Sequence, residues 1–213
     1  MRMLSACEYS GIVRDAFSRQ GWDAWSCDLL PTESELTKSE KKHIQGDVTG
    51  ILDEGWDLMI AFPPCTYLAV SGNRWFANNP ERWQAQVDAA LFAFKLLNSN
   101  IKHIALENPV SRLSTYIGKP TQTLLPSDFG ETFMVKTCCL WLKNLPFLFP
   151  TKMVQPEYDY VKDVRRKNGF SRYPKGYNSM AGDGKGRSKF WVGVAEAMAV
   201  QWTAYFEDSR LWK

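Results

Sequence analysis

A cysteine that directly follows two prolines is the first residue in this sequence whose position suggests chemistry. Cys65 comes after Pro63 and Pro64, and these end an apolar run over residues 56–62 that indicates a buried strand. The prolines stiffen the backbone before the thiol, so a nucleophile there would reach an electrophilic carbon with little orientational freedom left to lose. Thiolate chemistry would also need a nearby positive charge or helix N-terminus. A buried, inert cysteine remains the alternative.

A glutamate at the end of another apolar run is the second candidate. Glu107 lies in "ALENP", at the end of the run 102–108, and is followed by Asn108 and Pro109. A carboxyl that is partly removed from water has a raised pKa and can donate a hydrogen bond to a ring nitrogen. At the ends of neighbouring strands, Cys65 and Glu107 would form a nucleophile and acid pair. A solvent-facing carboxylate is the alternative.

The first turn of the chain, "ACEYSG", is a candidate binding site for a polar or anionic end of a cofactor. It has one glycine where the dinucleotide fingerprint has three, so the match to that motif is weak. Asp28 follows about 20 residues later, where an acid reaches ribose hydroxyls, although a plain surface aspartate fits the position equally well. The candidate residues of this region are Cys7, Glu8, Tyr9, Ser10, Gly11, Asp28 and Asp47.

Secondary-structure elements must bring these residues together, and the hydrophobic pattern of the sequence predicts which elements those are. Short apolar runs alternate with helical patterns, which favours an α/β fold with a parallel sheet. In such a sheet the strand C-termini share one edge, where ligands bind. Strands are expected over residues 2–7, 22–28, 41–48, 56–62, 102–108 and 134–145, helices over 11–21, 80–99 and 190–206, and a loop over most of 150–190.

Composition limits the class of protein. The 213 residues are 45% hydrophobic and 23% charged, which suits one domain over residues 1–213, and the net charge of +3 permits a nucleic-acid partner without requiring one. The five cysteines form no CxxC pair and favour free thiols and no metal site. No run is long and apolar enough for a membrane span, and the N-terminus lacks the layout of a signal peptide, so a cytoplasmic location is expected, in a bacterium or a phage-infected host.

Taken in order, "ACEYSG", the acid at residue 28, "GD" at residue 47, "PPC" and "EN" resemble the cytosine-C5 DNA methyltransferase family. The resemblance is closest to short members from phage genomes, in which "PPCTYL", "ENP", "TQTLLPSDFG", "TCCLWLKNLP" and "GVAEAMAVQW" recur. It covers nearly the whole chain. It implies a Rossmann-like methyltransferase fold with a mostly parallel sheet and helices on both faces, S-adenosylmethionine as cofactor, duplex DNA with a flipped cytosine as substrate, and a role in restriction-modification.

The resemblance also implies roles for individual residues. Cys65 would attack carbon 6 of cytosine, and Glu107 would hydrogen-bond the N3 and N4 edge while the methyl group passes to carbon 5. Residues 8–11 would contact the amino-acid end of the cofactor. Asp28 would hold the ribose, Asp47 the adenine amine, and Pro64 the region of the stacked ring.

The sequence departs from the family in two places. The arginine motif that supports the base oxygen and the cysteine is missing, and Lys136 is the candidate replacement. The target-recognition domain is reduced to a basic segment over residues 143–189. Its aromatic-interleaved cations suit phosphate contacts, although a solvated basic loop is the alternative. With Arg74 from the region that is a mobile loop in the family, the candidate DNA contacts are Arg74, Arg165, Arg166, Arg172, Lys175 and Arg187.

Three other functions were weighed. A transferase of the same chemistry could act on a free cytosine nucleotide, as the reduced recognition segment suggests. A catalytically silent DNA-binding protein would account for the missing arginine motif. A Rossmann-like oxidoreductase is disfavoured because the first turn lacks three glycines and "PPC" has no role there. The recognition sequence and the oligomeric state are not indicated by the sequence.

Overall fold

The computed structural model describes residues 1–70, 76, 79–133, 136–162, 164, 167, 170–175 and 189–211. Its centre is a sheet in the order β3-β2-β1-β4-β5-β7-β6, in which β7 alone runs in the direction opposite to the other six strands. The strands of this sheet are β1 (Arg2–Ala6), β2 (Asp23–Asp28), β3 (His43–Gln45), β4 (Leu58–Ala61), β5 (His103–Pro109), β6 (Gln122–Leu124) and β7 (Cys138–Lys143).

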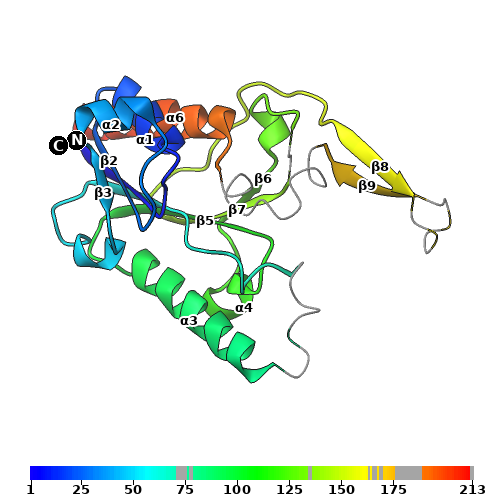
Figure 1. The fold of residues 1–213 in the computed structure, drawn as a ribbon. Helices are drawn as coiled ribbons and strands as arrows, with labels where there is room; N and C mark the ends of the chain where they lie inside the picture. The colour runs from blue at the N-terminus through cyan, green and yellow to red at the C-terminus, as the bar shows by residue number, and fades with distance from the viewer. Residues whose placement is uncertain are drawn as a thin grey trace.

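Helices cover both faces of the sheet, as Figure 1 shows, with α1 and α6 on one side and α3 and α4 on the other. The α-helices are α1 (Ile12–Arg19), α2 (Glu35–Glu40), α3 (Pro80–Leu97), α4 (Leu113–Ile117) and α6 (Val192–Leu211), and the 3-10 turns are η1 (Val48–Gly50) and η3 (Pro126–Asp128). The Rossmann-like fold expected from the sequence, with a mostly parallel sheet and helices on both faces, is therefore confirmed. Within the described ranges, no helix combines the length and apolar character needed to cross a bilayer.

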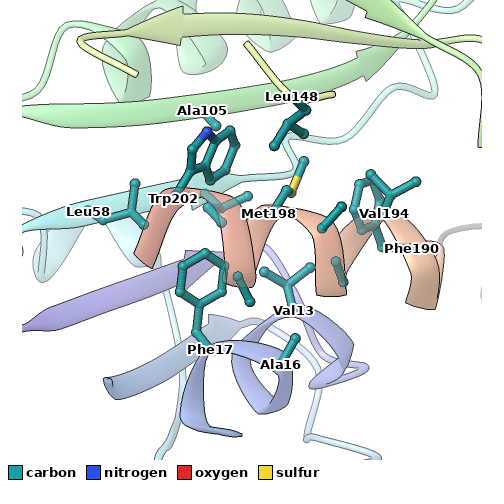
Figure 2. Packing of buried hydrophobic residues seen from close by; sticks show 14 of the residues in the cluster. Val13, Ala16, Phe17, Leu58, Ala105, Leu148, Phe190, Val194, Met198 and Trp202 are labelled. Atoms are coloured by element: carbon teal, nitrogen blue, oxygen red, sulfur yellow. The ribbon is translucent and has the colours of Figure 1, made fainter. Parts of the chain in front are cut away.

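The alternating side chains of each central strand feed two separate cores. Leu58 and Ile60 of β4 face α1 and α6, whereas Met59 and Ala61 face α3 and α4. Figure 2 shows the first core, in which α6 packs alongside α1 on one face of the sheet and presents Val194, Met198 and Trp202. Both faces of the sheet are thus buried, which leaves its edges and strand ends for binding.

Two sequence predictions about elements need correction. Most of residues 150–190 were expected to be loop, but this part of the chain contains a hairpin of β8 (Tyr158–Lys162) and β9 (Phe170–Pro174). The strand expected over 134–145 is shorter, since β7 begins at Cys138. The hairpin projects away from the sheet (yellow and orange in Figure 1) and has no part in either core, which explains why it left no hydrophobic pattern in the sequence.

Candidate functional site

The Pro-Pro-Cys turn starts where β4 ends. The Phe62 N–H donates to the Ala6 carbonyl oxygen at 2.9 Å, and the two prolines that follow have no N–H with which to continue the ladder. The chain then turns tightly, because the Cys65 carbonyl oxygen accepts from the N–H groups of Leu68 at 3.0 Å and Ala69 at 2.8 Å. Pro63 is buried, Pro64 is exposed and Cys65 is half-buried. The cysteine is therefore mounted between a strand end and a turn, at the ligand edge.

The end of β5 is joined to this turn by a buried hydrogen bond. Asn108 Nδ2 donates to the Pro63 carbonyl oxygen at 3.1 Å, and Asn108 is 1% exposed. Ala61 of β4 pairs with Leu106 of β5, so Glu107 and the start of the Pro-Pro-Cys turn lie at the same level of the sheet. The expectation that Cys65 and Glu107 come from neighbouring strand ends agrees with this register.

Glu107 lies on the α6 side of the sheet in an environment that favours its neutral form. Burial raises the pKa of Glu107 from 4.5 to about 7, although the charge of Lys136 and a hydrogen bond from the Cys138 thiol both lower it. Lys136 Nζ also lies 5.8 Å from the centre of the Trp191 ring. Lys136, predicted as the cationic group of the site, is thus within electrostatic reach of Glu107.

Glu8 in the first turn is held by the chain's own donors. One carboxylate oxygen accepts from the Ser10 hydroxyl and the Val13 N–H, each at 2.9 Å, and the other accepts from the Ser5 hydroxyl at 2.5 Å and the Arg14 N–H at 3.3 Å. Burial raises the pKa of Glu8, whereas these four bonds lower it. Glu8 therefore fixes the N-terminal end of α1 against β1, whatever else it contacts.

The backbone of the first turn is unusual at both of its ends. Cys7 has φ 59°, which is uncommon for a residue with a side chain, and Gly11 has φ 76° at the start of α1. Tyr9 is buried, and its carbonyl oxygen accepts from the Glu33 N–H at 2.9 Å. Ser10 is half-buried and its hydroxyl accepts from the Ile12 N–H at 3.3 Å. The single glycine of the turn thus stands at a position that requires its conformational freedom.

The ends of β1 and β2 and the residue before η1 bring two carboxylates to one place. Burial raises the pKa of the Cys7 thiol to about 12, with further contributions from Asp28, Cys27 and Asp47. Asp47 is exposed, and a hydrogen bond from the Thr49 N–H at 2.8 Å lowers its pKa. One oxygen of Asp28 accepts from the Leu30 N–H at 2.9 Å. The charges of Asp28 and Asp47, both predicted as cofactor contacts, thus act on Cys7 in the first turn.

These groups fit S-adenosylmethionine chemically. The cofactor carries a sulfonium cation, an ammonium group and two ribose hydroxyls, which are groups that carboxylates attract or accept hydrogen bonds from. Asp28 and Asp47 each retain carboxylate lone pairs that can accept further hydrogen bonds. The first turn, which follows β1, lies between the end of β2 and the Pro-Pro-Cys segment after β4. No cluster of His, Cys, Asp and Glu that would suit a metal ion occurs in the part of the chain that the structure describes.

The basic segment is represented in the structure by the β8–β9 hairpin. The guanidinium of Arg172 lies 4.1 Å from the centre of the Tyr158 ring, so this exposed cation is held in place by stacking. Lys175 instead forms an ion pair with Glu157, which raises the pKa of Lys175 and lowers that of Glu157. The remaining predicted DNA contacts lie outside the described residues: Arg74, Arg165, Arg166 and Arg187.

Sequence reasoning missed two residues that the structure places at this edge. Asn108 was named only as a neighbour of Glu107, and its bond to Pro63 joins residues 45 positions apart, beyond the reach of any local pattern. Cys138 was noted only as one of the free thiols, yet it is fully buried and bonds to Glu107. The β5–β7 pairing, which sets Pro109 opposite Cys138, would have indicated this contact had the strand register been known.

The solved structures to which this chain is similar include the two that follow. The chain is similar to a candidate DNA modification methyltransferase encoded within a prophage (E. coli), with a TM-score of 0.45 and 16% identity over 73% of this chain and 52% of that one. It is also similar to the 16S rRNA methylase RmtB, with a TM-score of 0.35 and 17% identity over 66% of this chain and 54% of that one. The chain thus spans about half the length of these two structures. No protein-family model and no curated protein matches the sequence.

Proposed function

We propose that this chain is an S-adenosylmethionine-dependent DNA cytosine-C5 methyltransferase. The observation that carries the proposal is the joining of the Pro-Pro-Cys turn to the end of β5 by Asn108 and Pro63, which brings the Cys65 segment and Glu107 to one edge. A carboxyl whose pKa is raised to about 7, on the strand next to the one that leads to the thiol, is the kind of partner that this chemistry needs. The resemblance of "PPC" and "ENP" to the family supports the same assignment.

The proposed reaction follows from the weakness of cytosine as a nucleophile at carbon 5. The Cys65 thiolate adds to carbon 6 and forms a C–S bond, while the electrons of the C5–C6 double bond move toward N3. Protonated Glu107 donates to N3 and stabilises the developing negative charge. Methyl transfer to carbon 5 would break the sulfur–methyl bond of the bound cofactor. Loss of the C5 proton to solvent and return of the N3 proton to Glu107 would then restore the C5–C6 double bond, as the C–S bond breaks and the Cys65 thiolate leaves.

S-adenosylmethionine supplies the electrophilic methyl group when it is bound. The residues that would hold it are those around the first turn, with Cys7, Glu8, Tyr9, Ser10 and Gly11 near its amino-acid end, Asp28 at the ribose, Asp47 at the adenine amine and Pro64 beside the stacked ring. Because Glu8 already accepts four hydrogen bonds from the chain, we assign it mainly to shaping the turn. The carboxylates of Asp28 and Asp47 are the stronger candidates for direct contact.

The proposed partner is duplex DNA whose target cytosine leaves the stack, at a cost of a few kcal/mol. The β8–β9 hairpin offers Arg172 for a phosphate, and its exposed apolar side chains include Tyr160 and Phe170. In the described part of the segment between β7 and α6, this hairpin is the only regular structure. So small a recognition element favours a second candidate, in which the same reaction takes place on a free cytosine nucleotide.

The test is bisulfite sequencing of DNA from cells that express the protein, with Cys65→Ala as the matched control. The proposal expects methylcytosine in a fixed short context with the native chain and none with Cys65→Ala. Labelled S-adenosylmethionine incubated with duplex DNA or with dCMP separates the two substrates, since label only on dCMP would establish the second candidate. Methyl transfer that survives Cys65→Ala would show that the mechanism is wrong. Duplex binding with no transfer at all would favour a silent DNA-binding protein.

A further inference from the structure

Helix α3 carries four large apolar side chains on the face that points away from the sheet. Four such residues lie four, four and three positions apart, and so share one side of the helix: Trp83, Val87, Leu91 and Phe94. Their exposed fractions are 52%, 38%, 60% and 51%, in that order. The buried positions of the same helix are Gln86, Ala90, Ala93 and Leu96, of which only Leu96 is a large apolar residue. We call the four exposed residues the α3 stripe.

The α3 stripe is a contiguous apolar patch of the size that functional surfaces on soluble proteins have. Together its side chains leave roughly 400 Å² of apolar surface in water, which is within the range of functional patches on soluble proteins. The helix lies at the margin of the molecule, on the side of the sheet opposite α1 and α6 (Figure 1). The core cluster does not include these residues, because α3 packs against the sheet through other positions, among them Ala90, Ala93 and Leu96. We infer that the α3 stripe is a self-association surface that binds the α3 stripe of a second copy of this chain.

The order of side chains along the stripe is what identifies a second copy as the occupant. From one end to the other the stripe reads aromatic, aliphatic, aliphatic, aromatic, so it is complementary to itself when reversed. In an antiparallel pair related by a two-fold axis, Trp83 lies opposite Phe94 of the partner subunit, and Val87 lies opposite Leu91 of the partner subunit. An isologous contact of this kind is the commonest in homo-oligomers.

The charges beside the stripe support the same arrangement. Glu81 and Lys95 are exposed on one flank of α3, near opposite ends of the helix. Reversal of the second helix brings each Glu81 next to Lys95 of the partner subunit, in the register that also pairs the apolar residues. Asp88, on the same flank, lies near the two-fold axis and would face its own copy, while accepting from Gln84 at 2.9 Å. The pairing thus gains two rim ion pairs and has one like-charge contact.

The size of the contact and the position of the candidate site are both compatible with a dimer. Two stripes would bury about 800 Å² of apolar surface, so the flanking residues must supply the rest of the 1,200–2,000 Å² that stable interfaces bury. Since α3 connects the parallel strands β4 and β5, it runs opposite to them and begins on the side of Cys65. Antiparallel pairing therefore leaves the two Cys65 edges at opposite ends of the dimer, where neither is covered.

Sedimentation equilibrium on the full chain tests the surface. We expect twice the 24.4 kDa chain mass, and the single-chain mass for Leu91→Glu with an unchanged circular dichroism spectrum. Val200→Glu is the matched control, because Val200 is an apolar residue of α6 that is 52% exposed, and it should remain a dimer. A wild-type chain that is monomeric at about 100 µM would overturn the proposal. A dimeric Leu91→Glu would overturn it equally, and both outcomes are independent of methyl transfer.

Three charge variants test the antiparallel register. Glu81→Lys and Lys95→Glu should each weaken association by about two- to fivefold, and the double variant should restore it. Asp88→Asn should tighten association, because it removes the like-charge contact near the axis. If the double variant associated more weakly than both single variants, or if Asp88→Asn had no effect on association, the stripes would not pair in this register.

Discussion

Asn108 Nδ2 donates to the Pro63 carbonyl oxygen at 3.1 Å, and both residues are buried. This bond joins the ends of two neighbouring parallel strands just beyond their paired residues. Pro63 cannot donate to the sheet, but its carbonyl is still a buried acceptor that needs a partner. The amide of Asn108 supplies that partner, and so sets the distance between the segment that carries Cys65 and the strand that carries Glu107.

Asn108→Ala should lower both stability and the proposed activity. It leaves the Pro63 carbonyl buried without its partner, so we expect a loss of about 1–3 kcal/mol in urea unfolding. We also expect a fall in kcat for methyl transfer larger than the change in KM, because the thiol and the carboxyl would lose their mutual alignment. Asn98→Ala is the control, because it removes an exposed asparagine that donates to the Phe94 carbonyl oxygen. It should lower neither the stability nor kcat. Equal effects of the two variants would contradict the role assigned to Asn108.

Glu107 should make the stability of the protein depend on pH in a defined range. Its pKa is raised from 4.5 to about 7, so the folded state binds the proton more tightly than the unfolded state does. The stabilisation is complete below about pH 4.5 and is lost as the pH rises through 7. Glu107→Gln should remove this dependence, and its stability relative to the native chain should rise by up to about 3 kcal/mol between pH 4.5 and 8. If the curves of unfolding free energy against pH were parallel for the native chain and Glu107→Gln, the prediction would be contradicted.

Cys138 should set where that transition falls. Its thiol donates to Glu107 and thereby lowers the pKa of the carboxyl, so Cys138→Ala should move the transition to higher pH, and Cys138→Ser, a stronger donor, to lower pH. The infrared band of the protonated carboxyl, followed against pH, measures the shift directly. Cys139→Ala is the control, because Cys139 is the adjacent buried thiol and lies on the other face of β7. A shift of the same size in Cys139→Ala would mean that general repacking of β7 is responsible.

The elements that were predicted correctly are those with a strong hydrophobic period and many long-range contacts. The helix expected over 80–99 and the strand over 56–62 were confirmed as α3 and β4, because β4 places apolar side chains in both cores and α3 buries Ala90, Ala93 and Leu96 against the sheet. The pieces β6 and α4 were not predicted, since three and five residues are too few to show a period. The segment of the hairpin was expected to be loop because β8 shows no alternation of buried and exposed side chains, and the hairpin contributes no residue to either core.

The candidate site was predictable only as far as strand ends can be read from a sequence. The expectation that Cys65 and Glu107 share an edge followed from the crossover rule and agrees with the β4–β5 register. The surroundings of Glu107 depend on β7, whose antiparallel pairing with β5 brings in Cys138 from 31 positions further along the chain. Pairing across that distance is decided by packing, so no spacing rule would have placed the thiol there.

Glu8 should contribute to stability in the absence of any cofactor. Glu8→Ala leaves the N–H groups of Val13 and Arg14 without their acceptor inside the protein, so we expect a loss of about 2–4 kcal/mol in thermal or urea unfolding. Glu35→Ala, at an exposed ion pair with Lys38, should cost less than about 0.5 kcal/mol and serves as the control. If Glu8→Ala kept full stability but lost S-adenosylmethionine binding, the carboxylate would instead be a direct ligand.

Arg172 and Lys175 should contribute unequally to the proposed binding of DNA. The Arg172 cation is stacked on Tyr158 and exposed, whereas the Lys175 cation is paired with Glu157 and must leave that partner before it can contact a phosphate. Arg172→Ala should reduce the slope of log K against log salt by about one, and Lys175→Ala by clearly less. Glu157→Gln releases the lysine, so it should strengthen binding and make a subsequent Lys175→Ala as costly as Arg172→Ala. Fluorescence anisotropy of a labelled duplex over a salt series measures the native chain and the four variants. A larger effect of Lys175→Ala than of Arg172→Ala in the native background would contradict the assignment.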